Sequence, residues 1–377
     1  MNLDLDWLQA AAAAVDLEAR EAAISRQGEL TKPPGSLGRL EDIAIQLAAL
    51  QGRAQPSLEQ VQISVFAADH GVATAGVSAF PQAVTAQMIA NMAAGGAAIS
   101  VLARQIGAGI ELINLGTVAP VAPHPLIRDA TIAAGTANLV EGPAMSTEQL
   151  GLALAEGAAA AQRARAASAD LFIAGEMGIG NTTAATAVTC ALLGRSAADL
   201  VGPGTGLDRS GIERKRLLID QALTRYQDQL RLNALPRMAT DASREVSIAR
   251  SREMATNALT QLGGFEITAM AGAYVACAQQ RMPMLIDGFI SSAAALAASR
   301  LCPGAADWML LAHASAEPGH RAMVEAIGLR PLLDLGMRLG EGSGAAAAVP
   351  LLRLACALHA QMATFAEAGV AEKVSQG

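Results

Sequence analysis

A glutamate surrounded by glycines is the residue of this chain best suited to act as a general base. Glu341 lies within residues 340–344, which read Gly-Glu-Gly-Ser-Gly and precede an alanine-rich segment. Glycines on both sides of a carboxylate let another group approach it closely. A general base needs a pKa nearer neutrality than that of a free glutamate; burial raises this pKa, whereas a helix dipole lowers it. The alternative explanation is an acidic residue at a helix start, where the dipole favours it.

The segment 175–183, which reads Gly-Glu-Met-Gly-Ile-Gly-Asn-Thr-Thr, has the composition of an anion-binding loop. Its glycines allow a ligand close to the backbone, and Asn181 begins a predicted helix whose first N–H groups can bind phosphate. The segment is neither a Walker A loop nor a Gly-x-Gly-x-x-Gly fingerprint. Because it follows an apolar run and contains Glu176, we predict a phosphate or ribose site rather than only a helix start.

A second glycine-rich loop, residues 202–206 (Gly-Pro-Gly-Thr-Gly), precedes Lys215. Flexible turns of this kind usually connect elements, so we assign its glycines no individual contacts. Lys215 could supply a positive charge to a phosphate, and a solvated helix lysine is the alternative.

Three histidines, His70, His313 and His320, lie in predicted loops. None belongs to a His-x-x-x-His pair, and the adjacent side chains of Asp69 and His70 diverge. No Gly-x-Ser-x-Gly motif surrounds a candidate nucleophile. We therefore interpret the histidines as hydrogen-bonded loop residues and predict an enzyme that needs no metal or redox cofactor.

Phe80 and Met88 flank the start of a predicted helix in a chain with only 3% aromatic residues. Core packing is the ordinary explanation for both. In a cleft, the two side chains would instead form a flat apolar slot for a planar heterocycle.

Strand-like runs must position these residues. Five short apolar runs alternate with helical segments: residues 61–67, 110–115, 171–174, 284–286 and 309–312. This alternation predicts an α/β fold with a Rossmann-like, mostly parallel sheet flanked by helices. The runs lead into Asp69, Gly116, Gly175, Asp287 and His313. Since ligands of open α/β sheets bind beyond the carboxyl ends of the strands, we expect these five ends to form one shared site.

Both ends of the chain lack strand-like runs. Three segments near them are helical in pattern: residues 7–28, about 37–51, and 345–370. We therefore predict a small helical domain from residues 1–58 and 340–377, and a large α/β catalytic domain from residues 59–339.

The composition limits the class of protein. Hydrophobic residues make up 52% of the 377 residues and charged residues 16%, which provides for a large core and argues against disorder. The net charge of −7 argues against a nucleic-acid partner. The four scattered cysteines and the acidic N-terminal segment indicate buried thiols in a cytoplasmic protein that neither is secreted nor spans a membrane.

Taken together, the motifs resemble the nicotinate-nucleotide–dimethylbenzimidazole phosphoribosyltransferases, a family of cobalamin nucleotide-loop assembly. The similarity covers nearly the whole chain and rests on residues 31–38, 68–71, 175–178, 181–183, 263–266, 287–289 and 338–344. Several long motifs in a fixed order are far more specific than any one of them.

This resemblance implies a homodimer that converts nicotinate mononucleotide and a benzimidazole-type base to an α-ribazole 5′-phosphate and nicotinate, with inversion at the anomeric carbon. It implies that Glu341 takes the imidazole proton while the other nitrogen attacks the ribose, and that Glu176 is a carboxylate of the nucleotide site. The remaining implied site residues are Gly178, Lys215 and Ser315 near the phosphate, and Phe80, Met88 and Leu339 on the wall of the base pocket.

Two other functions are compatible with parts of the sequence. One is a nucleotide- or NAD-dependent α/β enzyme of another class, but the glycine spacing that it requires is absent. The other is a non-catalytic nucleotide-binding homologue, which would have no need to retain Glu341 together with Glu176 and Lys215.

Overall fold

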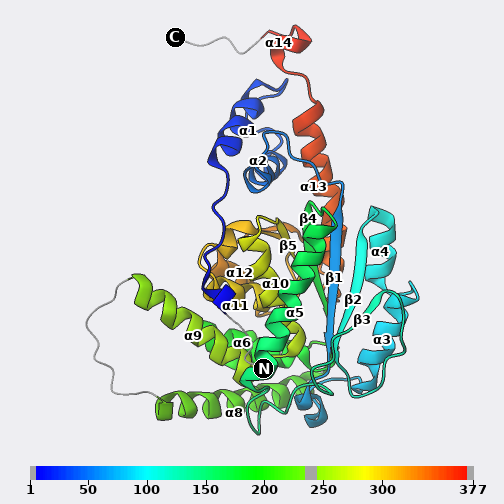
Figure 1. Ribbon diagram of the computed structural model, residues 1–377, viewed down its shortest axis with the longest axis vertical. Helices are drawn as coiled ribbons and strands as arrows, with labels where there is room; N and C mark the ends of the chain where they lie inside the picture. Colours follow the sequence, from blue (N-terminus) through cyan, green and yellow to red (C-terminus); the bar gives the residue numbers. More distant parts are fainter. Residues whose placement is uncertain (1–5, 234–243, 372–377) are drawn as a thin grey trace.

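The centre of the molecule is a seven-stranded parallel sheet. The computed structural model describes residues 6–233 and 244–371. The strand order is β3-β2-β1-β4-β5-β6-β7, and all neighbouring strands run parallel. The strands are β1 (Val61–Ala68), β2 (Gly109–Gly116), β3 (Ile127–Asp129), β4 (Leu171–Met177), β5 (Met284–Ile286), β6 (Met309–His313) and β7 (Pro331–Leu333). The predicted fold class is confirmed (Figure 1).

Helices cover both faces of the sheet. α5, α10 and α11 pack together on one face, and α3, α4 and α13 lie on the other. The α-helices are α1 (Leu17–Glu29), α2 (Arg39–Gln51), α3 (Ala83–Ala93), α4 (Ala98–Ile106), α5 (Thr147–Ala166), α6 (Asn181–Leu193), α7 (Ala197–Leu200), α8 (Arg209–Asn233), α9 (Arg244–Leu262), α10 (Phe265–Gln279), α11 (Phe289–Leu301), α12 (His320–Ile327), α13 (Ser343–Gln361) and α14 (Phe365–Ala368).

Small residues allow the helices to pack closely. Every residue of α10 from Phe265 to Ala278 is buried, so this helix is apolar on all sides and lies inside the molecule. A Cβ on Gly157 of α5 would collide with the backbone of Ala269, and one on Gly272 would collide with Leu154. The abundance of alanine and glycine therefore reflects helices whose backbones touch.

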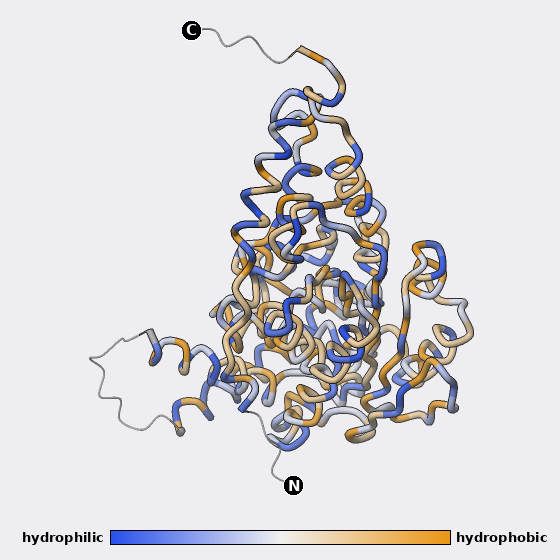
Figure 2. Tube along the Cα trace, turned by 45° about the horizontal axis from the view of Figure 1, so that its top comes forward, coloured by the Kyte–Doolittle hydropathy of each residue, from blue (hydrophilic) through white to orange (hydrophobic). Residues whose placement is uncertain are grey.

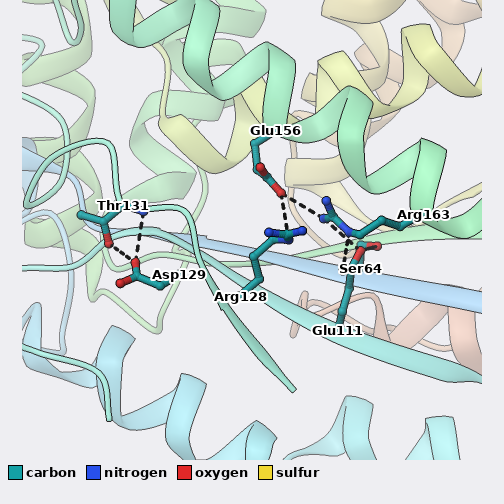
Figure 3. Close-up of polar contacts among 7 residues, drawn as sticks. All are labelled: Ser64, Glu111, Arg128, Asp129, Thr131, Glu156 and Arg163. Atoms are coloured by element: carbon teal, nitrogen blue, oxygen red, sulfur yellow. Dashed lines mark hydrogen bonds and ion pairs between the residues drawn. The ribbon is translucent and has the colours of Figure 1, made fainter. Parts of the chain in front are cut away.

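A network of ion pairs ties the edge of the sheet to α5 (Figure 3). Arg163 of α5 pairs with Glu111 of β2 at 2.9 Å and with Glu156 at 3.0 Å. Glu156 also pairs with Arg128 of the edge strand β3 at 3.5 Å, and Ser64 of β1 donates a hydrogen bond to Glu111. These contacts hold the short strand β3 in place although it exposes much of its surface.

The predicted terminal helices differ in detail from the observed ones. The segment 7–28 was expected to be one helix, but it forms a short 3₁₀-helix, Asp6–Gln9, and then α1, whose first turn is capped by the Asp16 side chain. The long C-terminal helix ends at Gln361, and α14 follows separately.

The helices from both ends of the chain lie together. α2 packs against both α1 and α13, and the three helices form one end of the molecule in Figure 1. α13 also packs against β6, so it joins the terminal helices to the sheet. The division into domains 1–58 plus 340–377 and 59–339 stays a prediction, and its parts 1–5, 234–243 and 372–377 lie outside the described residues.

Hydrophilic stretches recur along α1 and along the projecting arm of α8 and α9, whereas the body is mostly apolar (Figure 2). By length and composition, residues 83–106 and Ser343–Gln361 could each cross a membrane. In the fold, 44% and 56% of these windows are buried, as expected for helices that pack on a sheet.

Candidate active site

A cavity of about 440 Å³ opens at the carboxyl ends of β4, β5 and β6. The strand ends contribute Glu176, Asp287 and His313, and the cavity is completed by residues from α3 and by residues 338–341. Seven of the eight predicted site residues line it: Glu341, Glu176, Gly178, Ser315, Phe80, Met88 and Leu339.

The prediction that five strand ends share the site is wrong for the first two. Asp69, at the end of β1, accepts hydrogen bonds from Thr85 and from the backbone of Val118. Gly116, at the end of β2, accepts the backbone N–H of Asp69. These two ends therefore bond to each other and to the protein, and the chain reaches the cavity only further on, at Phe80.

Glu341 is held by an unusual turn. It has φ of 64°, between Gly340 at 89° and Gly342 at 85°, and the left-handed region costs a residue with a side chain about 1–2 kcal/mol. Glu341 is 4% exposed, and its Oε2 accepts the N–H of Ile99 at 3.3 Å. Burial raises the pKa of Glu341, the Ile99 N–H lowers it, and the Asp287 carboxylate raises it again, so that the net shift is upward. This shift favours a base that works near neutral pH.

Two glycines bring Glu341 close to the end of β4. A Cβ on Gly175 would collide with the carbonyl of Glu341, and one on Gly340 would collide with the carboxyl group of Glu176. These glycines are therefore needed for contacts within the protein. The sequence had instead suggested that they let a ligand approach. The 340–342 turn can sit against β4 only if positions 175 and 340 have no side chain.

Glu176 is the second carboxyl group in the cavity. Asn181 donates a short hydrogen bond to its Oε2. Burial raises the pKa of Glu176 to about 8, with further contributions from the negative charges of Glu266, Asp287 and Glu341. At neutral pH Glu176 is therefore mostly protonated. Two carboxyl groups with different environments can take different roles in one site.

The raised pKa of Glu176 predicts that the protein loses stability as the pH rises. Because the folded protein holds a proton that the unfolded chain releases near pH 4.5, the free energy of unfolding falls between about pH 4.5 and about pH 8, by an amount on the order of a few kcal/mol. Chemical denaturation at several pH values across this range measures the free energy of unfolding and tests the prediction. Glu176→Gln should flatten the slope, and Glu325→Gln, an exposed control, should not; equal slopes for all three proteins would contradict the prediction.

The other end of the cavity carries groups suited to an anion. Gly178 and Thr182 surround the start of α6, whose first turn is preceded by Gly180 at φ of 100°. Ser315 follows β6 and also lines the cavity. The positive end of a helix dipole, together with a hydroxyl group, is suited to bind phosphate.

Lys215 does not line the cavity but lies directly behind this end. Its Nζ donates to the Thr182 hydroxyl at 2.8 Å and to the Gly202 carbonyl at 3.3 Å. It is 0% exposed, so the alternative of a solvated lysine is wrong. Burial lowers the pKa of Lys215 to about 8, against the opposing effect of the Glu317 carboxylate. Its predicted role near a phosphate stays a prediction.

An apolar wall faces the opening of the cavity. Phe80 is 53% exposed and Leu339 59%, while Met88 is half-buried. Core packing is therefore the wrong explanation for Phe80. Its loop is fixed because Thr205 accepts the backbone N–H of Ala79 at 3.1 Å. The three side chains form an apolar part of the cavity lining, and their role in binding a base stays a prediction.

Several lining residues received no role from the sequence. Asp287 accepts the N–H of Ala345 at the start of α13, and its Oδ1 lies 3.5 Å from His313 Nε2. Burial lowers the pKa of His313, but the Asp287 carboxylate raises it and prevails. Arg338 and Glu317 are the other charged lining residues without an assigned role. Asp287 directly follows a strand, Glu317 lies in the loop after β6, and Arg338 begins the 338–344 motif, so each position carried a usable signal.

The prediction that the histidines lie in loops is wrong for two of them, because His313 is the last residue of β6 and His320 the first of α12. His70 bonds to Glu266 at 2.7 Å behind the cavity, and His320 bonds to Ser292 at 3.1 Å. Within residues 6–233 and 244–371, no three His, Cys, Asp or Glu residues are grouped in a way that could hold a metal ion.

Comparisons with known proteins identify the family of this chain. The sequence model of a family described as "Phosphoribosyltransferase" matches residues 12–370. The nicotinate-nucleotide–dimethylbenzimidazole phosphoribosyltransferase of Ectopseudomonas mendocina is 54% identical over 371 residues, 98% of this chain and 99% of that protein. The protein of the same name from Azotobacter vinelandii is 55% identical, over 97% and 98% of the two chains.

A solved structure supports the same assignment. The crystal structure of CobT from Thermus thermophilus superposes with a TM-score of 0.85 at 44% identity, and the match covers 94% of this chain and all of that one. The chain therefore belongs to the nicotinate-nucleotide–dimethylbenzimidazole phosphoribosyltransferase family, and the prediction of a phosphoribosyltransferase is confirmed.

Proposed function

We propose that this protein transfers the phosphoribosyl group of nicotinate mononucleotide to 5,6-dimethylbenzimidazole or a related base, as a cytoplasmic homodimer in cobalamin nucleotide-loop assembly. The observation that carries the proposal is one cavity with an apolar wall, two buried carboxyl groups and a helix start suited to phosphate. The name of the relatives specifies the same two substrates.

In this reaction the lone pair of one imidazole nitrogen attacks the anomeric carbon of the ribose. The bond from that carbon to the pyridinium nitrogen breaks, and nicotinate leaves with the bonding electrons. The second imidazole nitrogen then carries an acidic proton, which the Glu341 carboxylate accepts. Because the pyridinium is already a good leaving group, the protein's main task is to hold two flat rings on opposite faces of one ribose.

Glu176 supports this reaction as a neutral acid. Its protonated carboxyl group can donate a hydrogen bond to a ribose oxygen while it accepts one from Asn181. Because Glu176 is neutral, it places no negative charge beside Glu341. A charged Glu176 would raise the pKa of Glu341 too far for a proton acceptor at nearly neutral pH.

The proposal is tested by incubating the pure protein with nicotinate mononucleotide and 5,6-dimethylbenzimidazole and following nicotinate and α-ribazole 5′-phosphate by chromatography. We expect equal amounts of the two products. Nicotinate release without the riboside phosphate would indicate hydrolysis, and the absence of both products under all conditions would contradict the transferase proposal.

Phe80→Ser is expected to change the choice of base. Loss of the exposed ring removes apolar contact with the methyl groups of 5,6-dimethylbenzimidazole, so its rate should fall relative to that of adenine by a factor of about 3–10. Competition between pairs of bases measures this ratio. Val118→Ser, which removes another exposed apolar side chain but one outside the cavity, is the control. An unchanged ratio in Phe80→Ser would remove Phe80 from base selection.

A further inference from the structure

The glycine-rich loop 202–206 is held by charged side chains from three different segments. Glu317 Oε1 accepts the N–H of Gly204 at 3.1 Å. Arg338 donates to the carbonyl of the same residue at 3.2 Å, and Lys215 donates to that of Gly202 at 3.3 Å. The loop is therefore more than a connection, because its backbone groups bind charges that face or adjoin the cavity.

The Glu317 carboxylate is poorly paired for a group so deeply buried. Glu317 is 5% exposed and lines the cavity, yet its Oε2 has no hydrogen-bond donor in the part of the chain that the structure describes. A Cβ on Gly202 would collide with this oxygen and with the ring of Pro318, so the carboxylate packs directly against the loop. An ionised carboxylate with one oxygen unpaired is costly to bury. Such a group indicates a place that is suited to an anion. The carboxylate makes only some of the contacts that an anion could make there.

Lys215 and Arg338 supply the positive charge of this site. The Lys215 ammonium group and the Glu317 carboxylate attract each other, but they form no ion pair within 4.0 Å, since Lys215 donates to Thr182 and Gly202 instead. Lys215 lies behind the wall, while Glu317 lies on the cavity side. A space next to Gly204 that combines a loop N–H group, a helix start and a buried ammonium group is chemically an anion site.

We propose that Glu317 is an internal anion that occupies the phosphate end of the cavity in the free protein, and that the 5′-phosphate of the nucleotide displaces its carboxylate from Gly204. This inference rests on the proposed function. A phosphate with nearly two negative charges and the Glu317 carboxylate repel each other at this end. Glu317 therefore weakens the binding of every anion, and only a ligand that also contacts the rest of the cavity overcomes it.

The test compares ligands with and without the phosphate. Glu317→Gln keeps an oxygen for the Gly204 N–H and removes the negative charge. We therefore expect the KM for nicotinate mononucleotide to fall by about tenfold, because the phosphate no longer meets a like charge at this end. The inhibition constant of nicotinate riboside, which lacks the phosphate, should stay within about twofold of the wild-type value. Glu325→Gln removes an exposed carboxylate of α12 and serves as the charge-matched control.

Other outcomes overturn the inference. A weaker binding of both ligands to Glu317→Gln would show that Glu317 binds the ribose, and unchanged constants for both would show that its charge does not oppose the phosphate. The wild-type protein supplies a test that does not depend on the variant's folding. In crystals with bound nicotinate mononucleotide, Glu317 Oε1 should lie beyond hydrogen-bond distance of Gly204 N, and a retained bond would contradict the displacement. A wild-type protein that turns over no nucleotide would instead contradict the proposed function.

Discussion

Glu341→Gln is expected to lower kcat by a factor of about 10²–10⁴, the usual contribution of a positioned general base. The amide has nearly the same shape and can still accept the N–H of Ile99, so the 340–342 turn should persist. It cannot accept the imidazole proton. Steady-state turnover with nicotinate mononucleotide and dimethylbenzimidazole measures the effect.

The pH dependence of this variant provides a second readout. In the wild-type protein, protonation of Glu341 should reduce kcat/KM as the pH falls through its raised pKa. The residual activity of Glu341→Gln should lack this acidic limb. Thermal unfolding checks that the variant is folded, and a folded variant as fast as the wild-type protein would remove Glu341 from the role of base.

Gly175→Ala is expected to reduce kcat by at least about 10²-fold, because displacements on the order of 1 Å in a catalytic group have effects of this size. The new Cβ would collide with the carbonyl of Glu341 and push the turn away from the end of β4. The substitution changes no charged group, so its effect would show that the backbone contact between two distant segments positions the base.

Gly142→Ala is the matched control for this prediction. Gly142 has no heavy atom within 4 Å of an added Cβ, and its φ is not positive, so alanine fits there without strain. The control should keep wild-type activity. If Gly175→Ala were fully active, the turn could move without a change in kcat. That result would refute the rigid positioning of Glu341.

The sheet could be predicted from the sequence where strands are buried on both faces. β1 and β4 are almost entirely buried and read as continuous apolar runs. β3 and β7 were missed because each has only three residues at an edge of the sheet and none is buried. Their pairing depends on neighbours in the fold, such as the ion pair of Arg128 with Glu156 that attaches β3 to α5.

The candidate site was predictable where its residues follow strands or lie in glycine-rich motifs. Glu341 and Glu176 were singled out in this way, and the resemblance to the family then added Ser315. Contacts between segments far apart in sequence had no local signal. The bond between Glu317 and Gly204 spans 113 residues, and loop 202–206 therefore looked like a simple connection.

A helix N-terminus does act on Glu341, as the helix-dipole explanation says. The helix is α4, however, and not α13, which follows Glu341 in the chain. The carboxylate accepts an N–H from the first turn of α4, while Gly342 occupies the N-cap position of α13. The N–H lowers the pKa of Glu341, and burial, together with Asp287, outweighs it. Only the folded arrangement decides which of these effects prevails, because α4 lies more than two hundred residues earlier in the chain.

The most direct test of Glu341 as the base uses a substrate that has no proton to lose. 1-Methylbenzimidazole can attack the ribose through its free nitrogen, but the methyl group replaces the proton that Glu341 would accept. Wild-type protein and Glu341→Gln should therefore use 1-methylbenzimidazole at similar rates, while their rates with benzimidazole differ by a factor of about 10²–10⁴. An equally large difference with 1-methylbenzimidazole would show that Glu341 acts in some way other than by accepting the azole proton.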